Sequence, residues 1–287
     1  MSEPNHLVWI TGANGLIGNY LRQTGARFAP LWRVRTLART DFDLLDFARL
    51  EREFKEDRPE LVIHCAAITA VAEAQKNPAL AWQVNCDLTK LLAGLASENQ
   101  FVFFSTDLVF DGRKGNYLET DEVNPLTHYG ETKVAAEKIV LRNPRHLVVR
   151  TSINGGISAS GNRAFNEQLH VALLSSGQGV TLFTDEFRCP IPAVETARAI
   201  WELAQKKCTG LYHVAGAEKL SRWQIGQLLV RRWPEVNKKI QSGSARDFAG
   251  PPRALDTSLD IAKSQKALSN PLPGLTAWLA ANPNEPF

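Results

Sequence analysis

Short apolar runs alternate with longer amphipathic stretches through the first half of the chain. Each run holds about five residues and is rich in Val, Ile, Leu and Phe, the composition of strands buried on both faces of a parallel sheet. Runs of this length are typical of strands rather than of helices. The predicted strands are Leu7–Thr11, Val34–Ala38, Leu61–Cys65, Phe101–Ser105 and His146–Arg150.

The stretches between these runs have helical character, and Pro59 and Pro78 stand at links where helices begin or end. Strands and helices in this alternation predict right-handed crossovers. The expected fold class is therefore α/β, with a doubly wound parallel sheet of the Rossmann type. The predicted helices are Leu16–Ala26, Asp46–Asp57, Ala79–Glu98 and Tyr129–Asn143.

The second half of the chain is more broken. Thr151–Asn162 is rich in Gly, Ser and Asn and is expected to be a mobile loop. The elements after it are too few for an independent sheet domain, so we expect a smaller lobe packed on the first domain. Those elements are the strand Leu211–Val214 and helices near Phe165–Ser175, Val194–Gln205, Arg222–Arg232 and Gly274–Ala281.

Composition excludes several classes of protein. The 287 residues carry 33 Lys and Arg against 30 Asp and Glu, a net charge of +3. This balance argues against a nucleic-acid binder, which carries a concentrated basic face. No apolar run reaches the ~18 residues that span a bilayer, and the first residues lack the pattern of a signal peptide. We therefore expect a cytoplasmic protein with neither membrane nor nucleic acid as a partner.

Neither the cysteines nor the histidines indicate a metal site. Cys65, Cys86, Cys189 and Cys208 form no CxxC pair, and the six histidines show no ligand spacing. The thiols are expected to be reduced, with Cys65 a small core residue.

Three glycines follow the first predicted strand, at positions 12, 15 and 18 of TGANGLIG. Gly12 allows a tight turn, Gly15 lets the backbone approach a diphosphate, and Gly18 lets the next helix pack on the sheet. The alternative is an ordinary glycine-rich turn, but a position between strand and helix favours phosphate binding at the helix N-terminus. This assigns a dinucleotide-binding domain to residues 1–152, with parts of the second half, and a mainly substrate-binding lobe to residues 153–287.

The end of the second predicted strand bears on the choice of dinucleotide. Arg39 lies where a guanidinium could pair with the 2′-phosphate of NADP. Asp41 and Asp43 follow it, and an acid in this region is typical of NAD sites. An ordinary solvated arginine is the alternative interpretation. The sequence favours NADP(H) and leaves NAD(H) open.

The pentapeptide YGETK, Tyr129–Lys133, is the most informative about chemistry. Its i, i+4 spacing puts a phenol and an ammonium on one helix face. Tyrosine titrates near ~10, and a nearby cation lowers that pKa toward the range useful for proton transfer. Ser105 and Thr106 end a strand at the carboxyl edge of the sheet, where a hydroxyl can share a developing oxyanion. The alternatives are a surface helix and two strand-capping hydroxyls.

Together these residues resemble the extended short-chain dehydrogenase/reductase superfamily. Within it, the chain is similar to the dTDP-4-dehydrorhamnose reductase family, which also includes the regulatory subunit of methionine adenosyltransferase. The similarity runs almost end to end and is looser in the second half. The segments that carry it include TGANGLIG (Thr11–Gly18), RPELVIHCAAITAV (Arg58–Val71), QVN (Gln83–Asn85), FFSTDLVFDG (Phe104–Gly112) and NPLTHYGETKVAAEK (Asn124–Lys138).

The resemblance implies NADPH-dependent reduction of the C4 ketone of a nucleotide-linked 4-keto-6-deoxy sugar. Tyr129 would donate the proton, Lys133 would tune Tyr129 and bind the ribose, and Thr106 would steady the carbonyl oxygen. The resemblance also implies a set of cofactor-binding residues. They are Gly12, Asn14, Gly15, Leu16, Ile17, Gly18, Arg39, Asp43, Leu44, Cys65, Ala66, Ala67, Asn85, Ser105, Tyr129 and Lys133.

Departures from the family pattern lie on the expected substrate side. Leu108 replaces a tyrosine, Ile153 an aromatic residue, and Arg188 and Cys189 stand where small residues are usual. A different sugar nucleotide or another carbonyl compound is therefore an open alternative. Two other functions also stay open: an NAD-dependent sugar-nucleotide epimerase or dehydratase, and a non-catalytic NADP-binding regulatory subunit. A homodimer is open as well.

Three arginines of the second half, Arg163, Arg188 and Arg253, are candidates to meet a substrate diphosphate. The alternative is that they are ordinary surface arginines, and for any single one of them that interpretation is favoured.

Overall fold

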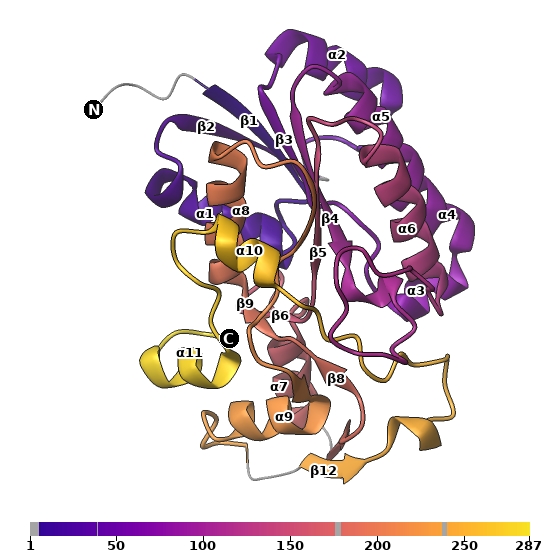
Figure 1. Ribbon diagram of the computed structural model, residues 1–287, viewed down its shortest axis with the longest axis vertical. Coiled ribbons are helices and arrows are strands. Elements are labelled where there is room, and N and C mark those ends of the chain that lie inside the picture. Colours follow the sequence, from indigo (N-terminus) through magenta and orange to yellow (C-terminus); the bar gives the residue numbers. More distant parts are fainter. Residues whose placement is uncertain (1–5, 39, 176–178, 237–239) are drawn as a thin grey trace.

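The computed structural model describes residues 6–38, 40–175, 179–236 and 240–287. Its centre is a six-stranded parallel sheet in the order β10-β5-β4-β3-β1-β2 (Figure 1). The predicted α/β, doubly wound fold is confirmed. The strands of this sheet are β1 (His6–Thr11), β2 (Trp32–Leu37), β3 (Leu61–His64), β4 (Gln100–Thr106), β5 (Leu147–Thr151) and β10 (Gly210–His213).

Helices cover both faces of the sheet (Figure 1). Successive residues of a strand face opposite sides, so Val8 and Ile10 of β1 join one core while Leu7 and Trp9 join the other. Both cores are apolar, which explains why the central strands β1, β3 and β4 are nearly continuous hydrophobic runs. The edge strand β2 carries two arginines and is partly exposed. One face carries α1 (Leu16–Phe28), α8 (Ala193–Gln205) and α10 (Ala262–Ala267), and the other carries α2 (Phe47–Asp57), α5 (Leu88–Leu95) and α6 (His128–Val140).

The helix predicted at Ala79–Glu98 is confirmed as one helical segment, but it is not α-helical throughout. The structure has α4 (Pro78–Trp82), then a π-helical turn at Gln83–Asp87, then α5. The wider turn places Asn85 inside the protein, fully buried. A further helix, α3 (Val71–Lys76), escaped prediction because six residues are too few to show a helical period.

The smaller lobe has its own apolar core and short paired strands. The strand predicted for it at Leu211–Val214 is instead β10, which pairs with β5 at the edge of the main sheet. Thr151–Asn162, expected to be a loop, contains β6, which pairs with β9. The lobe elements are β6 (Asn154–Gly155), α7 (Phe165–Ser175), β7 (Val180–Phe183), β8 (Phe187–Arg188), β9 (Ile191–Pro192), β11 (Leu220–Ser221), α9 (Arg222–Val230), β12 (Ile240–Gly243) and α11 (Leu275–Ala281).

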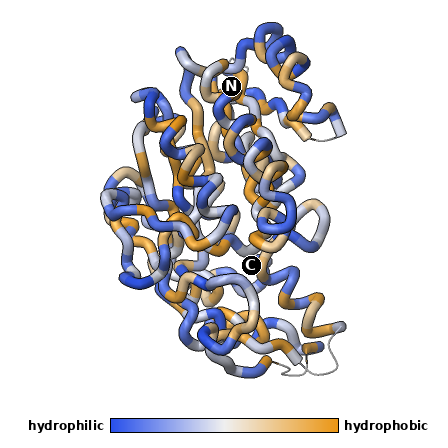
Figure 2. Tube along the Cα trace, turned by 90° about the vertical axis from the view of Figure 1, so that its right-hand side faces the viewer, coloured by the Kyte–Doolittle hydropathy of each residue, from blue (hydrophilic) through white to orange (hydrophobic). Residues whose placement is uncertain are grey.

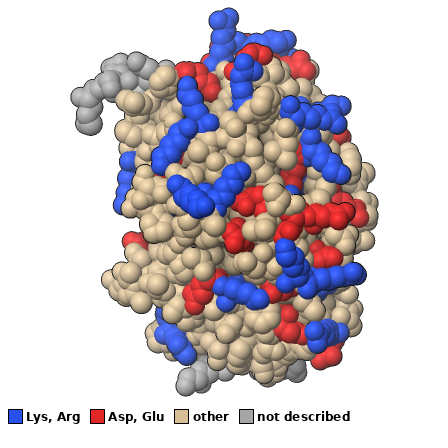
Figure 3. Space-filling view, in the orientation of Figure 1, with Lys and Arg blue, Asp and Glu red and all other residues tan. Residues whose placement is uncertain are grey.

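The distribution of polar residues agrees with this arrangement. Hydrophilic and hydrophobic residues alternate along the helical turns in Figure 2. On the face drawn in Figure 3, positive and negative side chains are interspersed rather than gathered into one basic patch. Within the described ranges, no helix has both the length and the apolar character needed to cross a membrane.

Candidate active site

The glycine turn predicted between the first strand and helix connects β1 to α1. Gly12 has a φ of 67°, and a Cβ there would lie 2.6 Å from the backbone nitrogen of Ala66. A Cβ on Gly18 would lie 2.4 Å from the carbonyl oxygen of Gly12. Both positions therefore require glycine for the turn to close against the segment after β3.

The same turn fits the diphosphate of a dinucleotide. Gly15 is the N-cap of α1, and no side chain caps that helix end. Free N–H groups and the helix dipole there suit an anion. Nearby at the carboxyl end of β4, the hydroxyl of Ser105 is buried with no hydrogen-bond partner among the described residues. An unpaired buried hydroxyl is suited to a ligand group.

The other predicted cofactor residues lie along this edge of the sheet. Asn14 is exposed, while Leu16, Ile17 and the Cys65–Ala67 segment are partly exposed and follow β1 and β3. Asp43 and the buried Leu44 follow β2. Arg39 lies outside the described residues. The role of each as a cofactor ligand stays a prediction.

His64, at the end of β3, forms hydrogen bonds through both of its ring nitrogens. Its Nδ1 is 2.7 Å from the hydroxyl of Thr11, and its Nε2 is 3.1 Å from that of Thr89. Burial, and secondly the charge of Lys133, lower the pKa of His64 to about 3. The imidazole is therefore neutral at physiological pH and anchors the strand ends by hydrogen bonds rather than by charge.

Helix α6 carries the predicted tyrosine and lysine. The Thr127 hydroxyl caps it by accepting from the Gly130 N–H at 3.2 Å. A Cβ on Gly130 would come within 2.5 Å of the Leu108 carbonyl, so glycine lets this helix end lie close to the segment after β4. Tyr129 and Lys133 are both buried, and their i, i+4 spacing places them on one helix face.

The structure brings Tyr129 together with Thr106, as the sequence predicts. The lowered pKa that the sequence analysis expects for Tyr129 is not found in the structure. Burial raises the pKa of Tyr129 well above its ordinary range, a hydrogen bond with Thr106 lowers it in part, and the nearby charge of Asp107 raises it further. The phenol is thus protonated at neutral pH and placed to donate. Thr106 ends β4 and is likewise buried.

Lys133 lies above the ring of Phe103, with Nζ 4.3 Å from the ring centroid. Burial lowers its pKa to about 8, against the attraction of Glu137 one turn further along α6. Glu137 is in turn held by Arg150 of β5 through bonds of 2.9 and 2.7 Å, and both side chains are 4% exposed. This ion pair fixes Glu137, whose charge acts on Lys133, and the sequence analysis did not predict it.

Asn85, predicted to bind cofactor, uses its side chain within the protein. Its Oδ1 accepts from the Ile68 N–H at 2.8 Å, and its Nδ2 donates to the Ile68 carbonyl and the Thr132 hydroxyl, each at 3.0 Å. It therefore ties the segment after β3 to α6 beside Tyr129 and Lys133. Direct contact with cofactor stays a prediction.

A buried ionic cluster links the site to the smaller lobe, and sequence reasoning missed part of it. Glu186 is fully buried and pairs with Arg188 at 2.9 Å, Arg222 at 3.1 Å and Arg253 at 2.5 Å. Burial alone would raise the pKa of Glu186, but these guanidinium groups outweigh it and lower that pKa. On its other side, Arg188 approaches Asp107, with Nε 3.6 Å from Oδ2.

The surface interpretation of the three candidate arginines is wrong for one of them. Arg188 is 3% exposed, whereas Arg163 is exposed and Arg253 is partly exposed. The sequence analysis named two members of this cluster, Arg188 and Arg253, and missed Glu186 and Arg222. Of the two carboxylate partners of Arg188, Glu186 is near it in the chain and Asp107 is far from it. No local spacing pattern predicts either contact.

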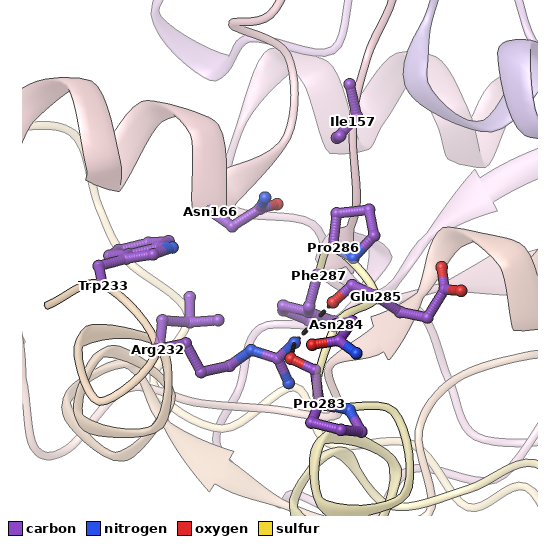
Figure 4. A pocket seen from close by; sticks show the side chains of 10 residues that line it. Ile157, Asn166, Arg232, Trp233, Pro283, Asn284, Glu285, Pro286 and Phe287 are labelled. Atoms are coloured by element: carbon purple, nitrogen blue, oxygen red, sulfur yellow. Dashed lines mark hydrogen bonds between the residues drawn. The ribbon is translucent and has the colours of Figure 1, made fainter.

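A separate pocket of about 370 Å³ lies in the lobe and includes none of the predicted site residues (Figure 4). Arg232 holds its wall by donating to the carbonyl oxygens of Pro283 and Glu285 at 2.6 and 2.7 Å. Its lining residues are Ile157, Asn166, Leu229, Arg232, Trp233, Pro283, Asn284, Glu285, Pro286 and Phe287.

With the fold and the site in place, comparison with known proteins gives the family. The family described as RmlD substrate binding domain matches residues 6–281. The chain belongs to this family. The resemblance to dTDP-4-dehydrorhamnose reductases within the extended short-chain dehydrogenase/reductase superfamily is thereby confirmed.

Relatives of similar length support this assignment. The chain is 30% identical to the probable low-salt glycan biosynthesis reductase Agl14 of Haloferax volcanii, over 95% of this chain and 96% of that protein. It is 28% identical to the dTDP-4-dehydrorhamnose reductase of Sinorhizobium fredii, over 85% of each chain. The dTDP-4-dehydrorhamnose reductase of Bacillus anthracis, solved in complex with NADP, has the same fold, with a TM-score of 0.87, 23% identity and 96% and 98% coverage.

Proposed function

We propose that this protein is an NADPH-dependent oxidoreductase that reduces the C4 ketone of a nucleotide-linked 4-keto-6-deoxy sugar. The observation that carries the proposal is the buried set of Thr106, Tyr129 and Lys133 at the carboxyl edge of the sheet. It adjoins a glycine turn suited to a diphosphate. Membership of a family that includes dTDP-4-dehydrorhamnose reductases supports the same reaction class.

Each residue of the set has a distinct task. NADPH, when bound, supplies the hydride for the reduction. Tyr129 gives its phenolic proton to the ketone oxygen, and the Thr106 hydroxyl donates a hydrogen bond to that oxygen. Lys133 stays mostly protonated at neutral pH and stabilises the phenolate left on Tyr129. We assign the ribose hydroxyls of the cofactor to Lys133 as well, and the 2′-phosphate of NADPH to Arg39.

The ionic cluster offers a place for the charged end of a sugar nucleotide. Three guanidinium groups face the two carboxylates of Glu186 and Asp107, which leaves a surplus of positive charge. Of these, Arg222 and Arg253 have side chains 22% and 30% exposed, so both can reach a diphosphate at the surface. Arg188 is enclosed, which makes it the weaker candidate.

Steady-state oxidation of NADPH, and separately of NADH, with freshly prepared dTDP-4-keto-6-deoxy sugar tests the proposal. Turnover with NADPH above NADH is the expected result, and Arg39→Ala should lower the ratio of the two rates. Binding of NADPH without turnover would reject this substrate. Turnover with equal rates would reject the role of Arg39.

A regulatory NADP-binding subunit is the second candidate, favoured by the replacement of two aromatic residues of the family pattern by Leu108 and Ile153. Such a subunit would bind NADPH and reduce no ketone. The epimerase or dehydratase alternative predicts instead that NAD copurifies with the protein. Assays specific for NAD and for NADP, run on the nucleotide released from the denatured protein, together with the ketone-reduction assay, distinguish these cases.

A further inference from the structure

The two carboxylate oxygens of Asp107, the residue after Thr106, have unequal partners. Oδ2 accepts from the Ser152 hydroxyl at 2.7 Å and from the Thr257 hydroxyl at 2.9 Å, and Arg188 Nε lies 3.6 Å from it. Oδ1 accepts a long hydrogen bond of 3.3 Å from the hydroxyl of Thr106. The donors therefore gather on the oxygen that faces away from the proposed catalytic hydroxyl.

Arg188 is fixed in this position from its other edge. Its Nη1 donates to the carbonyl oxygens of Phe187 at 2.7 Å and Ala254 at 3.0 Å, and its Nη2 pairs with Glu186 at 2.9 Å. With the outer edge of the guanidinium bound and the residue 3% exposed, Nε stays directed at Asp107. A small residue at this position, as is usual in the family, would leave Asp107 without this cation.

The Thr106 hydroxyl has one proton, and three oxygens can compete for it. One is the phenolic oxygen of Tyr129, with which Thr106 shares a hydrogen bond. The others are Oδ1 of Asp107 and the ketone oxygen of the proposed substrate. A carboxylate oxygen accepts more strongly when the negative charge of the group rests on it. Two hydroxyl donors and a guanidinium at Oδ2 draw the charge to that side, which weakens Oδ1 as an acceptor.

We propose that Arg188 is a positioning residue for the Thr106 proton: by holding the charge of Asp107 on Oδ2, it leaves the Thr106 hydroxyl free to donate to the ketone oxygen. This role rests on the proposed ketone reduction and extends it. The long bond from Thr106 to Asp107, beside the short bonds to Ser152 and Thr257, is the geometry that such a division of charge produces. Arg188 thus acts on catalysis without touching the substrate.

Steady-state kinetics of Arg188→Met test the role, with Arg145→Met as the matched control. Arg145 belongs to an exposed ion pair with Glu98, with side chains 56% and 80% exposed, and has no part in the proposed site. We expect Arg188→Met to lower kcat about tenfold, a loss of one strong hydrogen bond to the transition state, with KM changed less than about twofold. The kcat of Arg145→Met should stay within about threefold of the wild type.

The double variant Asp107→Asn, Arg188→Met separates this role from a structural one. Without the carboxylate at position 107, no charged acceptor competes for the Thr106 proton, so the double variant should have a higher kcat than Arg188→Met. If the losses in kcat of Asp107→Asn and of Arg188→Met multiply in the double variant, the proposal is refuted. If Arg188→Met does not fold, Arg188→Gln and the double variant, which removes both charges, give the same comparison.

Affinity for dTDP, measured by calorimetry, gives a readout independent of turnover. Arg188→Met should bind dTDP as the wild type does, while Arg253→Met should bind it less tightly. An equal loss in both would make Arg188 a diphosphate ligand and overturn the proposal. The same kinetic series includes the wild type: no ketone reduction by the wild type would refute the proposed function, whereas wild-type turnover with an unchanged kcat in Arg188→Met would refute this role alone.

Discussion

The buried ammonium of Lys133 should destabilise the protein, and Lys133→Met measures by how much. Folding brings this group out of water and lowers its pKa from 10.5 to about 8. At about pH 7 the lysine is charged in both states, so the folded protein carries the whole cost, roughly 3 kcal/mol from the two pKa values. Methionine of similar length avoids that cost but forfeits the contact with Phe103, worth about 1 kcal/mol. The expected net gain in the free energy of unfolding is about 2 kcal/mol.

The sign of the pH dependence follows from the same shift. Between the folded and unfolded pKa values the unfolded chain binds more protons, so wild-type stability rises with pH in this window. The advantage of Lys133→Met should therefore be full below about pH 8 and should shrink by roughly 2 kcal/mol at about pH 9.5. Activity should be lost at every pH.

Urea unfolding of the cofactor-free protein at about pH 7 and about pH 9.5 is the assay. Lys138→Met is the matched control, because Lys138 is exposed on the same helix and should change stability by less than about 0.5 kcal/mol. A Lys133→Met protein no more stable than the wild type at neutral pH would refute the reasoning. So would an advantage that does not depend on pH.

Three further predictions concern the same site. Glu137→Gln should lower the free energy of unfolding, measured in urea, by about 3 kcal/mol, because it leaves the buried Arg150 unpaired. The control Glu98→Gln breaks an exposed pair, with side chains 56% and 80% exposed, and should cost under about 1 kcal/mol. Equal effects of the two substitutions would contradict this. Tyr129→Phe should reduce kcat at least about 100-fold, with the NADPH dissociation constant by fluorescence titration nearly unchanged, and retained turnover would exclude Tyr129 as the acid. Gly18→Ala should weaken NADPH binding at least about tenfold, since its Cβ would meet a carbonyl oxygen at 2.4 Å and displace the turn; wild-type affinity would show that the turn does not hold the diphosphate.

Local pattern was enough to predict the sheet and the proposed catalytic pair. The five predicted strands lie within two residues of those observed, and the central ones are visible as apolar runs because both of their faces are covered. Tyr129 and Lys133 share a helix face through their spacing alone. The glycines at 12 and 18 reflect contacts that leave no room for a Cβ, and that requirement is visible in the sequence as residue type.

Tertiary structure decided what surrounds the pair. Nothing in the local sequence places Arg188 against Asp107, or Arg150 against Glu137, because such pairs depend on how separate strands and helices come together. The sequence analysis assigned β10 to the lobe, whereas in the structure it pairs with β5 in the main sheet. The strands and most of the helices could be predicted from the sequence, since periodicity and backbone limits act over a few residues. The partners that set the charge and proton position of each group come from long-range packing, which only the folded chain defines.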